Sequence, residues 1–230
     1  MISQMTSESV VLLHGLAANR LVMVRLAKHL TAEHFHVQNW GYPSIRRSIE
    51  WHAHAFSERL REFERGQRHD RVHIVAHSMG GIIARRALTL DRPAKLGRFV
   101  MLAPPNSGSH VARRLANALG RICPPLHELS DDAESYVRRL EEPAEVELGV
   151  IAAESDSVVK LPSTFLQSQS DHLVLPGRHG TLPWRRDTCQ QLAHFLRPGH
   201  FESDALSPSY SNRHPMMTTR NRLGTESPSP

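Results

Sequence analysis

The stretch RVHIVAHSMGGIIARRALTL, residues 71–90, changes its pattern of apolar side chains at one serine. Before Ser78, apolar residues alternate from Val72 to Ala76, which is the period of a strand. After Ser78, they recur at the three- and four-residue spacing of a helix. The stretch therefore predicts a strand, a sharp turn that carries Ser78, and a helix that begins near Met79.

The residues around Ser78 are those that a nucleophile elbow requires, in which a serine on a strand-to-helix turn exposes its hydroxyl at the sheet edge. Ala76, Gly80 and Gly81 supply small side chains beside the turn. The helix N-terminus would add free N–H groups and a positive dipole end near a developing oxyanion. The alternative is that Ser78 only caps the helix, a common role of serine. We favour the nucleophile because a cap does not need small neighbours.

Short apolar segments alternate with amphipathic helical segments along the rest of the chain. The clearest helix carries one apolar stripe from Ile49 to Phe63 and ends at Gly66. Strands that alternate with helices need crossover connections, so this pattern predicts an α/β fold with a mostly parallel sheet and helices on both faces. We expect about six strands, over residues 10–13, 35–43, 71–76, 98–105, 146–154 and 172–176. Further helices are expected over about 19–30, from Met79 onward and over 185–196.

Length and composition predict one globular domain over residues 1–198, because 230 residues with 40% hydrophobic side chains can bury a sizeable core. The alternation breaks at about 107–143, a polar, proline-containing insertion after the fourth predicted strand. This insertion is either a lid over a cleft or an ordinary surface elaboration. Residues 199–230 are rich in Ser, Pro, Thr and Asn without periodicity, so we expect a disordered tail.

Charge and composition argue against several functions. The net charge is +5, but Arg and Glu are interleaved as on a solvated helix face, so we expect no nucleic-acid partner. No apolar run approaches the ~18 residues of a membrane span, and the N-terminus lacks the regions of a signal peptide. We therefore expect a cytoplasmic protein, with at most transient contact with a lipid surface. Cys123 and Cys189 should stay reduced, and the 16 histidines show no metal-ligand spacing, which predicts no metal site.

Three motifs together resemble the α/β-hydrolase superfamily, and within it the small bacterial lipases and esterases. They are VVLLHG at 10–15, AHSMGG at 76–81, and a later Asp-x-Val that is followed by a histidine. The resemblance covers roughly residues 8–198 and implies a three-layer fold with a catalytic triad in the order Ser, Asp or Glu, His. Ala76 stands where glycine is commoner, a variant known among lipase-like members.

The resemblance also assigns residues around Ser78. Two backbone N–H groups would hold the oxyanion, those of Met79 and Leu16. Gly15 permits the turn that the second donor needs. Residues expected to border the pocket are His14, Gly15, His77 and Asn106. His14 is expected to be a structural hydrogen-bonding residue, because it precedes the serine in the chain.

The triad acid should follow a strand end downstream of Ser78. Asp156, in the sequence Ser-Asp-Ser-Val-Val at 155–159, resembles the Asp-Gly-x-Val turn of the family, with Ser157 in place of glycine. The alternative is an ordinary Asx turn, with Glu154 as the nearest substitute and Asp171 as a more distant one.

The base should follow the last strand, and two histidines flank it. His172 would begin this strand, whereas His179 lies in the loop beyond its carboxyl end. Active sites of open parallel sheets gather at the carboxyl ends of the strands, so we favour His179. A surface histidine is the alternative, and His194 on the closing helix is expected to pack or be exposed.

These assignments predict a serine hydrolase that cleaves carboxylic esters through an acyl-enzyme, without a cofactor. A substrate with an apolar acyl group is favoured by apolar residues in the insertion, namely Leu115, Ala118, Leu119 and Ile122. Three other hypotheses stay open: thioester or amide cleavage or acyl transfer with the same triad, a non-catalytic binding protein on this scaffold, and an interaction role for the tail. The sequence indicates no oligomeric state.

Overall fold

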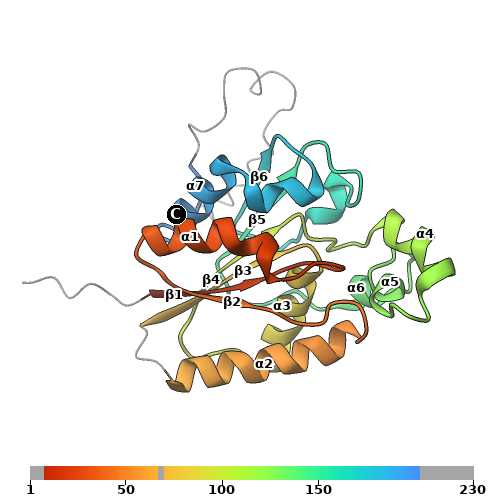
Figure 1. Cartoon of the computed structure of the whole chain (residues 1–230), viewed down its shortest axis with the longest axis horizontal. Coiled ribbons are helices and arrows are strands. Elements are labelled where there is room, and N and C mark those ends of the chain that lie inside the picture. The colour runs from red at the N-terminus through yellow and green to blue at the C-terminus, as the bar shows by residue number, and fades with distance from the viewer. Residues whose placement is uncertain (1–7, 67–69, 203–230) are drawn as a thin grey trace, which may run out of the picture.

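A single sheet of six parallel strands organises the computed structural model, which describes residues 8–66 and 70–202 (Figure 1). The strand order is β2-β1-β3-β4-β5-β6, and each neighbouring pair is parallel. The strands are β1 (Glu8–Leu13), β2 (His36–Trp40), β3 (Arg71–His77), β4 (Leu96–Leu102), β5 (Leu148–Ala153) and β6 (Asp171–Leu175). The α/β class and the parallel sheet predicted from the sequence are confirmed.

Helices cover both faces of this sheet, which gives three layers (Figure 1). One face carries α1 (Val24–Ala32) and α7 (Arg186–Phe195), and the other carries α2 (Ile49–Gly66) and α3 (Met79–Leu90). Short 3-10 helices in the connections are η1 (Arg20–Met23), η2 (Leu161–Thr164) and η3 (His179–Trp184). The helices expected from Ile49, from Met79 and over 185–196 are all present, and the one expected over 19–30 is divided into η1 and α1.

The strand β1 shows why this sheet forms. Val11 and Leu13 point into the apolar cluster beneath α2 and α3, whereas Val10 and Leu12 point into the cluster beneath α1 and α7. All four side chains are fully buried. The sequence of a strand that is covered on both faces is continuously apolar, because neither set of alternating side chains contacts water.

Two strands end clearly earlier than expected. The strand predicted over 35–43 is β2, which ends at Trp40. The strand predicted over 98–105 is β4, which ends at Leu102. The next residue, Ala103, has φ of +46°, a left-handed conformation that a strand cannot accommodate. The chain therefore turns at Ala103, at the carboxyl edge of the sheet.

The insertion contains α4 (His110–Leu119), α5 (Pro125–Glu128) and α6 (Tyr136–Arg139), which lie together at one end of the molecule (Figure 1). Hydrogen bonds join it to the body at separate places. The Ile49 N–H donates to Glu128 over 2.8 Å, and the Tyr136 hydroxyl donates to Glu50 over 2.5 Å. The α5 and α6 part of the insertion is thus tied to the start of α2.

The packed body continues past residue 198, where the tail was expected to begin. The Phe201 side chain is buried against Phe195, with ring centroids 4.7 Å apart. Its N–H donates to Asp171 over 2.7 Å. The expected boundary is therefore too early, and the remainder of the expected tail, 203–230, lies outside the described residues.

Three features bear on the expectations from composition. Across residues 8–66 and 70–202, no helix is long and apolar enough to cross a membrane. The same residues contain no group of three or more His, Cys, Asp or Glu side chains suited to a metal ion. Cys123 and Cys189 are both buried free thiols.

Candidate active site

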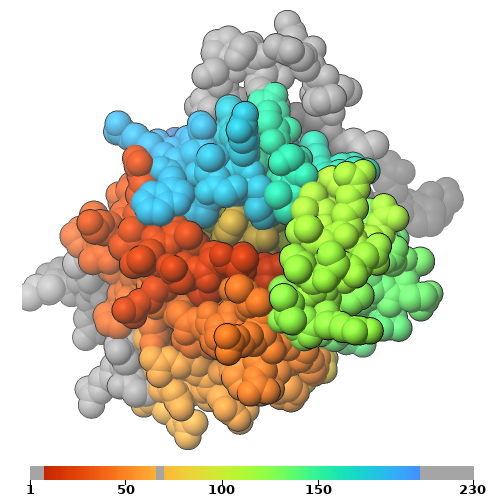
Figure 2. Space-filling view, turned by 45° about the vertical axis from the view of Figure 1, so that its right-hand side comes forward, coloured from red at the N-terminus to blue at the C-terminus, as the bar shows by residue number. Residues whose placement is uncertain are grey.

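Ser78 lies on the turn between β3 and α3, at the carboxyl edge of the sheet. Figure 2 looks toward this end of the molecule and shows a hollow, with atoms of the β3–α3 segment in yellow at its floor. The N-terminal part of the chain in red, the insertion in green and the C-terminal part in blue surround the hollow. The strand-to-helix turn therefore lies at the bottom of this hollow, where Ser78 is 8% exposed.

The backbone at Ser78 is strained. Its φ is +54° and its ψ is −124°, a combination that non-glycine residues rarely adopt. The side chain makes no capping hydrogen bond to α3. The observation argues against the capping alternative, because a cap would have extended backbone and an accepting hydroxyl.

Close packing beside Ser78 explains one of the two neighbouring glycines. A Cβ at Gly80 would lie 2.6 Å from the His14 carbonyl oxygen, whereas a Cβ at Gly81 would lie 3.5 Å from its nearest neighbours, an ordinary contact. A side chain at position 80 would therefore push β1 away from the turn.

Gly80→Ala is expected to lower the free energy of unfolding by about 1–3 kcal/mol, the usual cost of overpacking. Gly81→Ala is the matched control and should change it by at most about 1 kcal/mol, since alanine also favours the helix. Urea denaturation of both variants measures the difference. Equal stability of the two variants would contradict the account of the turn.

Three polar side chains meet above the edge of the sheet. Nε2 of His179 lies 2.9 Å from the Ser78 hydroxyl oxygen, and Nδ1 of His179 lies 2.8 Å from a carboxylate oxygen of Asp156. His179 begins η3, just after β6, and Asp156 follows β5. The structure thus brings together the three residues that the sequence singled out, from three separate connections.

Asp156 is held in one orientation. Its side chain is only 3% exposed, and its second carboxylate oxygen accepts from the N–H groups of Val158 and Val159, each over 2.8 Å. Burial by itself would raise the pKa of Asp156, but hydrogen bonding and charge from His179 and the two N–H groups outweigh it, so the pKa is lowered. The carboxylate is therefore charged at neutral pH and accepts a hydrogen bond from Nδ1–H of His179, which leaves Nε2 to accept a hydrogen bond from the Ser78 hydroxyl.

His77 holds the loop that carries His179. Nε2 of His77 lies 3.0 Å from the carbonyl oxygen of His179, and the two ring centroids are 5.0 Å apart. Burial, together with the nearby His179, lowers the pKa of His77 to about 3. His77 is neutral at pH 7, so it donates from Nε2 to the carbonyl.

His14 is a structural residue, as expected. Its ring is fully buried and stacks on Tyr42 with centroids 4.2 Å apart. Nδ1 lies 2.9 Å from the Gly15 carbonyl oxygen, Nε2 accepts from the Tyr42 N–H over 3.3 Å, and the Tyr42 hydroxyl donates to the His14 carbonyl over 2.5 Å. These bonds hold the loop after β1. Tyr42 lay within the segment 35–43 that was expected to be a strand, and no pattern marked it as a partner of His14. The observed strand β2 ends at Trp40, so Tyr42 lies in the loop that follows.

The two expected oxyanion donors belong to segments next to Ser78. Met79 is the first residue of α3, so its N–H has no acceptor in a preceding helical turn. Leu16 follows Gly15, where an added Cβ would lie 3.0 Å from the Cβ of Ser78. The loop after β1 therefore runs directly beside the serine.

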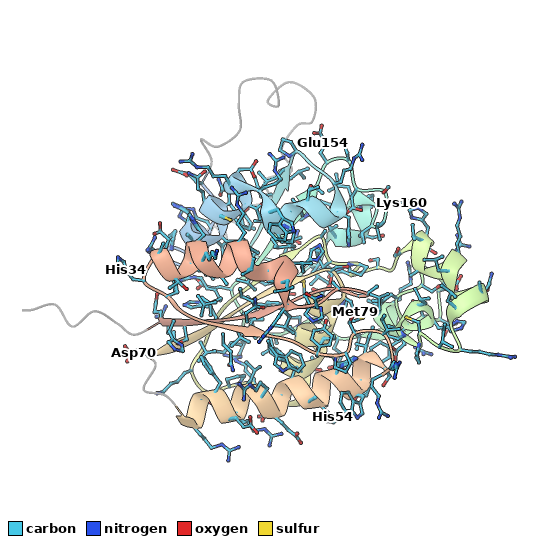
Figure 3. All side chains as sticks on the ribbon, in the orientation of Figure 1. His34, His54, Asp70, Met79, Glu154 and Lys160 are labelled. Carbon is cyan, nitrogen blue, oxygen red and sulfur yellow. The ribbon has the colours of Figure 1, made fainter. Side chains whose placement is uncertain are left out.

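The alternative acids and bases lie elsewhere. Nε2 of His172 is 2.9 Å from the Thr164 hydroxyl, and its ring stacks on Phe165. Burial lowers the pKa of His172 to about 4. Asp171 accepts from the N–H groups of His172 and Phe201, and Glu154 is exposed at the periphery (Figure 3). The ring of His194 packs edge-on to His200.

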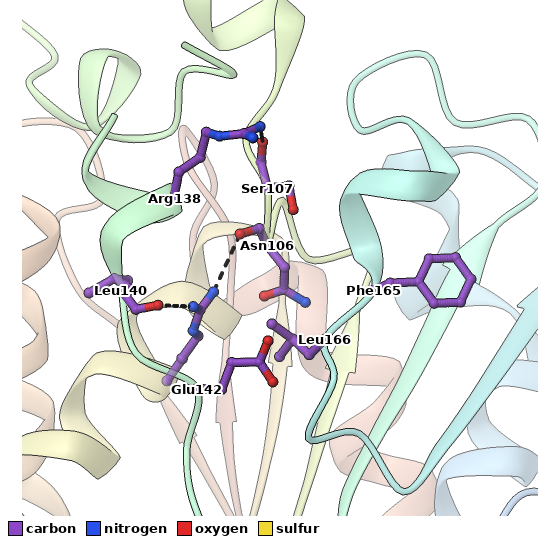
Figure 4. Close-up of a pocket in the computed structure, with 8 residues that line it drawn as sticks. Asn106, Ser107, Arg138, Leu140, Glu142, Phe165 and Leu166 are labelled. Atoms are coloured by element: carbon purple, nitrogen blue, oxygen red, sulfur yellow. Dashed lines mark hydrogen bonds between the residues drawn. The ribbon is translucent and has the colours of Figure 1, made fainter. Parts of the chain in front are cut away.

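Asn106 borders a cavity of about 180 Å³ that no triad candidate lines (Figure 4). Its amide nitrogen donates to the Thr164 carbonyl over 2.8 Å. The buried Arg85 donates from Nε to the Glu141 carbonyl over 2.9 Å and also contacts the Leu140 and Asn106 carbonyls. Arg85 thus joins α3 to the end of the insertion. Arg85 was not predicted from the sequence. The signal that could have found it is its spacing, since it lies three residues from both Ile82 and Leu88 and so on the buried side of α3.

A parallel sheet with a strained serine after one strand, and with Ser78, Asp156 and His179 in this order along the chain, is typical of the α/β-hydrolase fold. Residues 10–225 match the model of the alpha/beta hydrolase family, and the chain belongs to that family. Among curated proteins, none matches the chain.

Solved structures of lipases and phospholipases share the fold. The mature form of the lipase BlEst2 from Bacillus licheniformis superposes with a TM-score of 0.60 at 15% identity, over 76% of this chain and 85% of that one. Phospholipase PlaB from Legionella pneumophila gives 0.66 at 18% identity, over 85% and 60%. Lipase B from Aspergillus fumigatus gives 0.66 at 15% identity, over 83% and 52%. These likenesses establish the fold, and with the family they support a hydrolase activity in general.

Proposed function

We propose that the protein is a serine hydrolase that cleaves carboxylic esters through an acyl-enzyme. The observation that carries this proposal is the continuous hydrogen-bonded chain from Ser78 through His179 to Asp156. A serine hydroxyl is a weak nucleophile until a base removes its proton, and the base works best when an acid orients it. The chain of contacts supplies both conditions.

In the first step, Nε2 of His179 takes the hydroxyl proton while the Ser78 oxygen forms a bond to the carbonyl carbon of the ester. The carbonyl oxygen becomes an oxyanion, which the N–H groups of Leu16 and Met79 stabilise, each by about 3 kcal/mol. Asp156 stabilises the imidazolium that His179 becomes. The strained turn at Ser78 favours this step because it holds the hydroxyl above the sheet edge.

In the second step, the carbon–oxygen bond to the alcohol breaks, and the imidazolium of His179 gives its proton to the departing oxygen. The acyl group stays on Ser78. His179 then removes a proton from water, which attacks the acyl carbon, and the carboxylic acid leaves as Ser78 regains its proton. The cycle needs neither a metal nor an organic cofactor.

The products of a soluble ester test this function. With p-nitrophenyl esters of short to long acyl chains, the protein is expected to release one carboxylic acid per nitrophenol, with water as the acceptor. A thioester and an anilide of the same acid serve as comparisons, and an added alcohol reports acyl transfer. Preferential acylation of the alcohol or cleavage of the thioester alone would favour the other reactions of the same triad, and no turnover by folded protein would contradict the proposal.

A further inference from the structure

The helix α4 presents its large apolar side chains to solvent. Its contact with the body is made by Ala112 and Ala116, each 6% exposed. Leu115 and Leu119 are each 42% exposed, and Ile122, in the turn that follows, is 68% exposed. We call these three exposed residues, Leu115, Leu119 and Ile122, the α4 face.

This arrangement is the reverse of the other long helices. In α2 the fully buried side chains include Phe56 and Leu60, and in α7 they include Leu192 and Phe195. An amphipathic helix normally buries its large apolar residues against the core. Leu115 and Leu119 are four residues apart and so lie on the same side of α4, and Ile122 follows them in the next turn of the chain. Such a group of exposed apolar side chains marks an interaction surface.

The charges near the α4 face indicate what it contacts. Arg114 and Arg121 are exposed, and they directly precede Leu115 and Ile122 in the chain. Arg113 forms an ion pair with Asp131 over 2.7 Å, but the ion pairs of residues 8–66 and 70–202 include neither Arg114 nor Arg121. Exposed apolar side chains with neighbouring arginines complement an anionic phospholipid surface, which offers phosphate charges above an acyl layer.

The position of α4 fits this partner. Figure 2 shows the insertion in green at the rim of the hollow whose floor is the β3–α3 segment. The start of α2, next to α5, adds Trp51, which is 46% exposed and lies under the Arg47 guanidinium at 5.3 Å. Tryptophan and arginine side chains both suit the boundary between headgroups and acyl chains.

We propose that the α4 face docks the protein onto an anionic phospholipid surface, with its three apolar side chains at the acyl boundary and Arg114 and Arg121 on the phosphates. A second copy of the chain is a poorer occupant, because a two-fold contact through this narrow face would bring the arginines of both copies together. The proposal goes beyond the hydrolase function and stands without it, since docking needs no reaction at Ser78.

The test uses the full chain with Ser78→Ala, so that docking is measured without turnover. Sedimentation with vesicles of phosphatidylglycerol and phosphatidylcholine is compared with vesicles of phosphatidylcholine alone. The protein should bind the anionic vesicles, and less so in high salt. Leu115→Ser, Leu119→Ser and Ile122→Ser together should weaken binding at least about tenfold. Arg114→Gln and Arg121→Gln should each weaken it about fivefold.

Lys28→Gln with Arg65→Gln is the matched control for the double variant Arg114→Gln with Arg121→Gln, because it removes the same two charges from α1 and from the far end of α2. It should weaken binding less than that double variant. The triple serine variant should unfold at the same temperature as the Ser78→Ala parent when followed by circular dichroism, which separates loss of docking from loss of folding. No binding of anionic vesicles, or equal binding by the triple variant, overturns the proposal. A dimer that the triple variant makes monomeric, without vesicle binding, assigns the face to a second copy instead.

Discussion

Replacing His179 by alanine is expected to lower kcat/KM for a soluble ester by about 10⁴-fold or more, as removal of a triad base does. Without the imidazole, the hydroxyl of Ser78 has no partner at 2.9 Å to take its proton, and the leaving alcohol has no proton donor. Steady-state kinetics with a p-nitrophenyl ester measure the loss.

His172→Ala is the matched control, since it removes an imidazole from the same strand–loop region. The ring of His172 contacts Thr164 and Phe165. The His172→Ala variant should therefore keep kcat/KM within a few-fold of the parent. Circular dichroism of both variants checks that they fold. If His172→Ala abolished activity and His179→Ala did not, the base would have to be reassigned.

Asp156→Asn is expected to lower kcat by about 10⁴-fold while the fold is kept. The amide can still contact His179, but its NH₂ group favours the imidazole tautomer with the proton on Nε2, which cannot accept from Ser78. The lost negative charge also removes the group that stabilises the imidazolium. The kinetics of the same soluble ester measure this effect.

Glu154→Gln is the control for Asp156→Asn, because Glu154 is the nearest other carboxylate in the chain and its side chain is exposed. It should leave kcat unchanged. A loss of activity in Glu154→Gln that matches the loss in Asp156→Asn would argue that neither carboxylate orients His179, and that the segment as a whole was disturbed.

The sequence predicted the layered fold because both of its signals are local. A strand buried on both faces must be apolar at successive positions, as Val10 to Leu13 are. The change of period at Ser78 marks the turn between β3 and α3. The convergence of Asp156 and His179 could also be anticipated, because parallel strands have their carboxyl ends at one edge of the sheet.

The surface of α4 could not be predicted in the same way. Periodicity shows that Leu115 and Leu119 share one side of a helix, but not that the side formed by Ala112 and Ala116 packs on the body. That choice depends on how closely the helix approaches its neighbours, which the insertion's own sequence does not encode. Phe201 was missed for a related reason, since a single aromatic residue after the last helix has no pattern to mark it.

Covalent labelling of Ser78 tests the central claim most directly. The purified protein and its Ser78→Ala variant are treated with a fluorophosphonate, and the intact mass of each is measured. The account predicts that the parent gains the mass of one phosphonyl group and that Ser78→Ala, equally well folded, gains none. Folded parent protein that stays unlabelled, or a Ser78→Ala variant that is labelled as fully as the parent, would contradict the claim that Ser78 is an activated nucleophile.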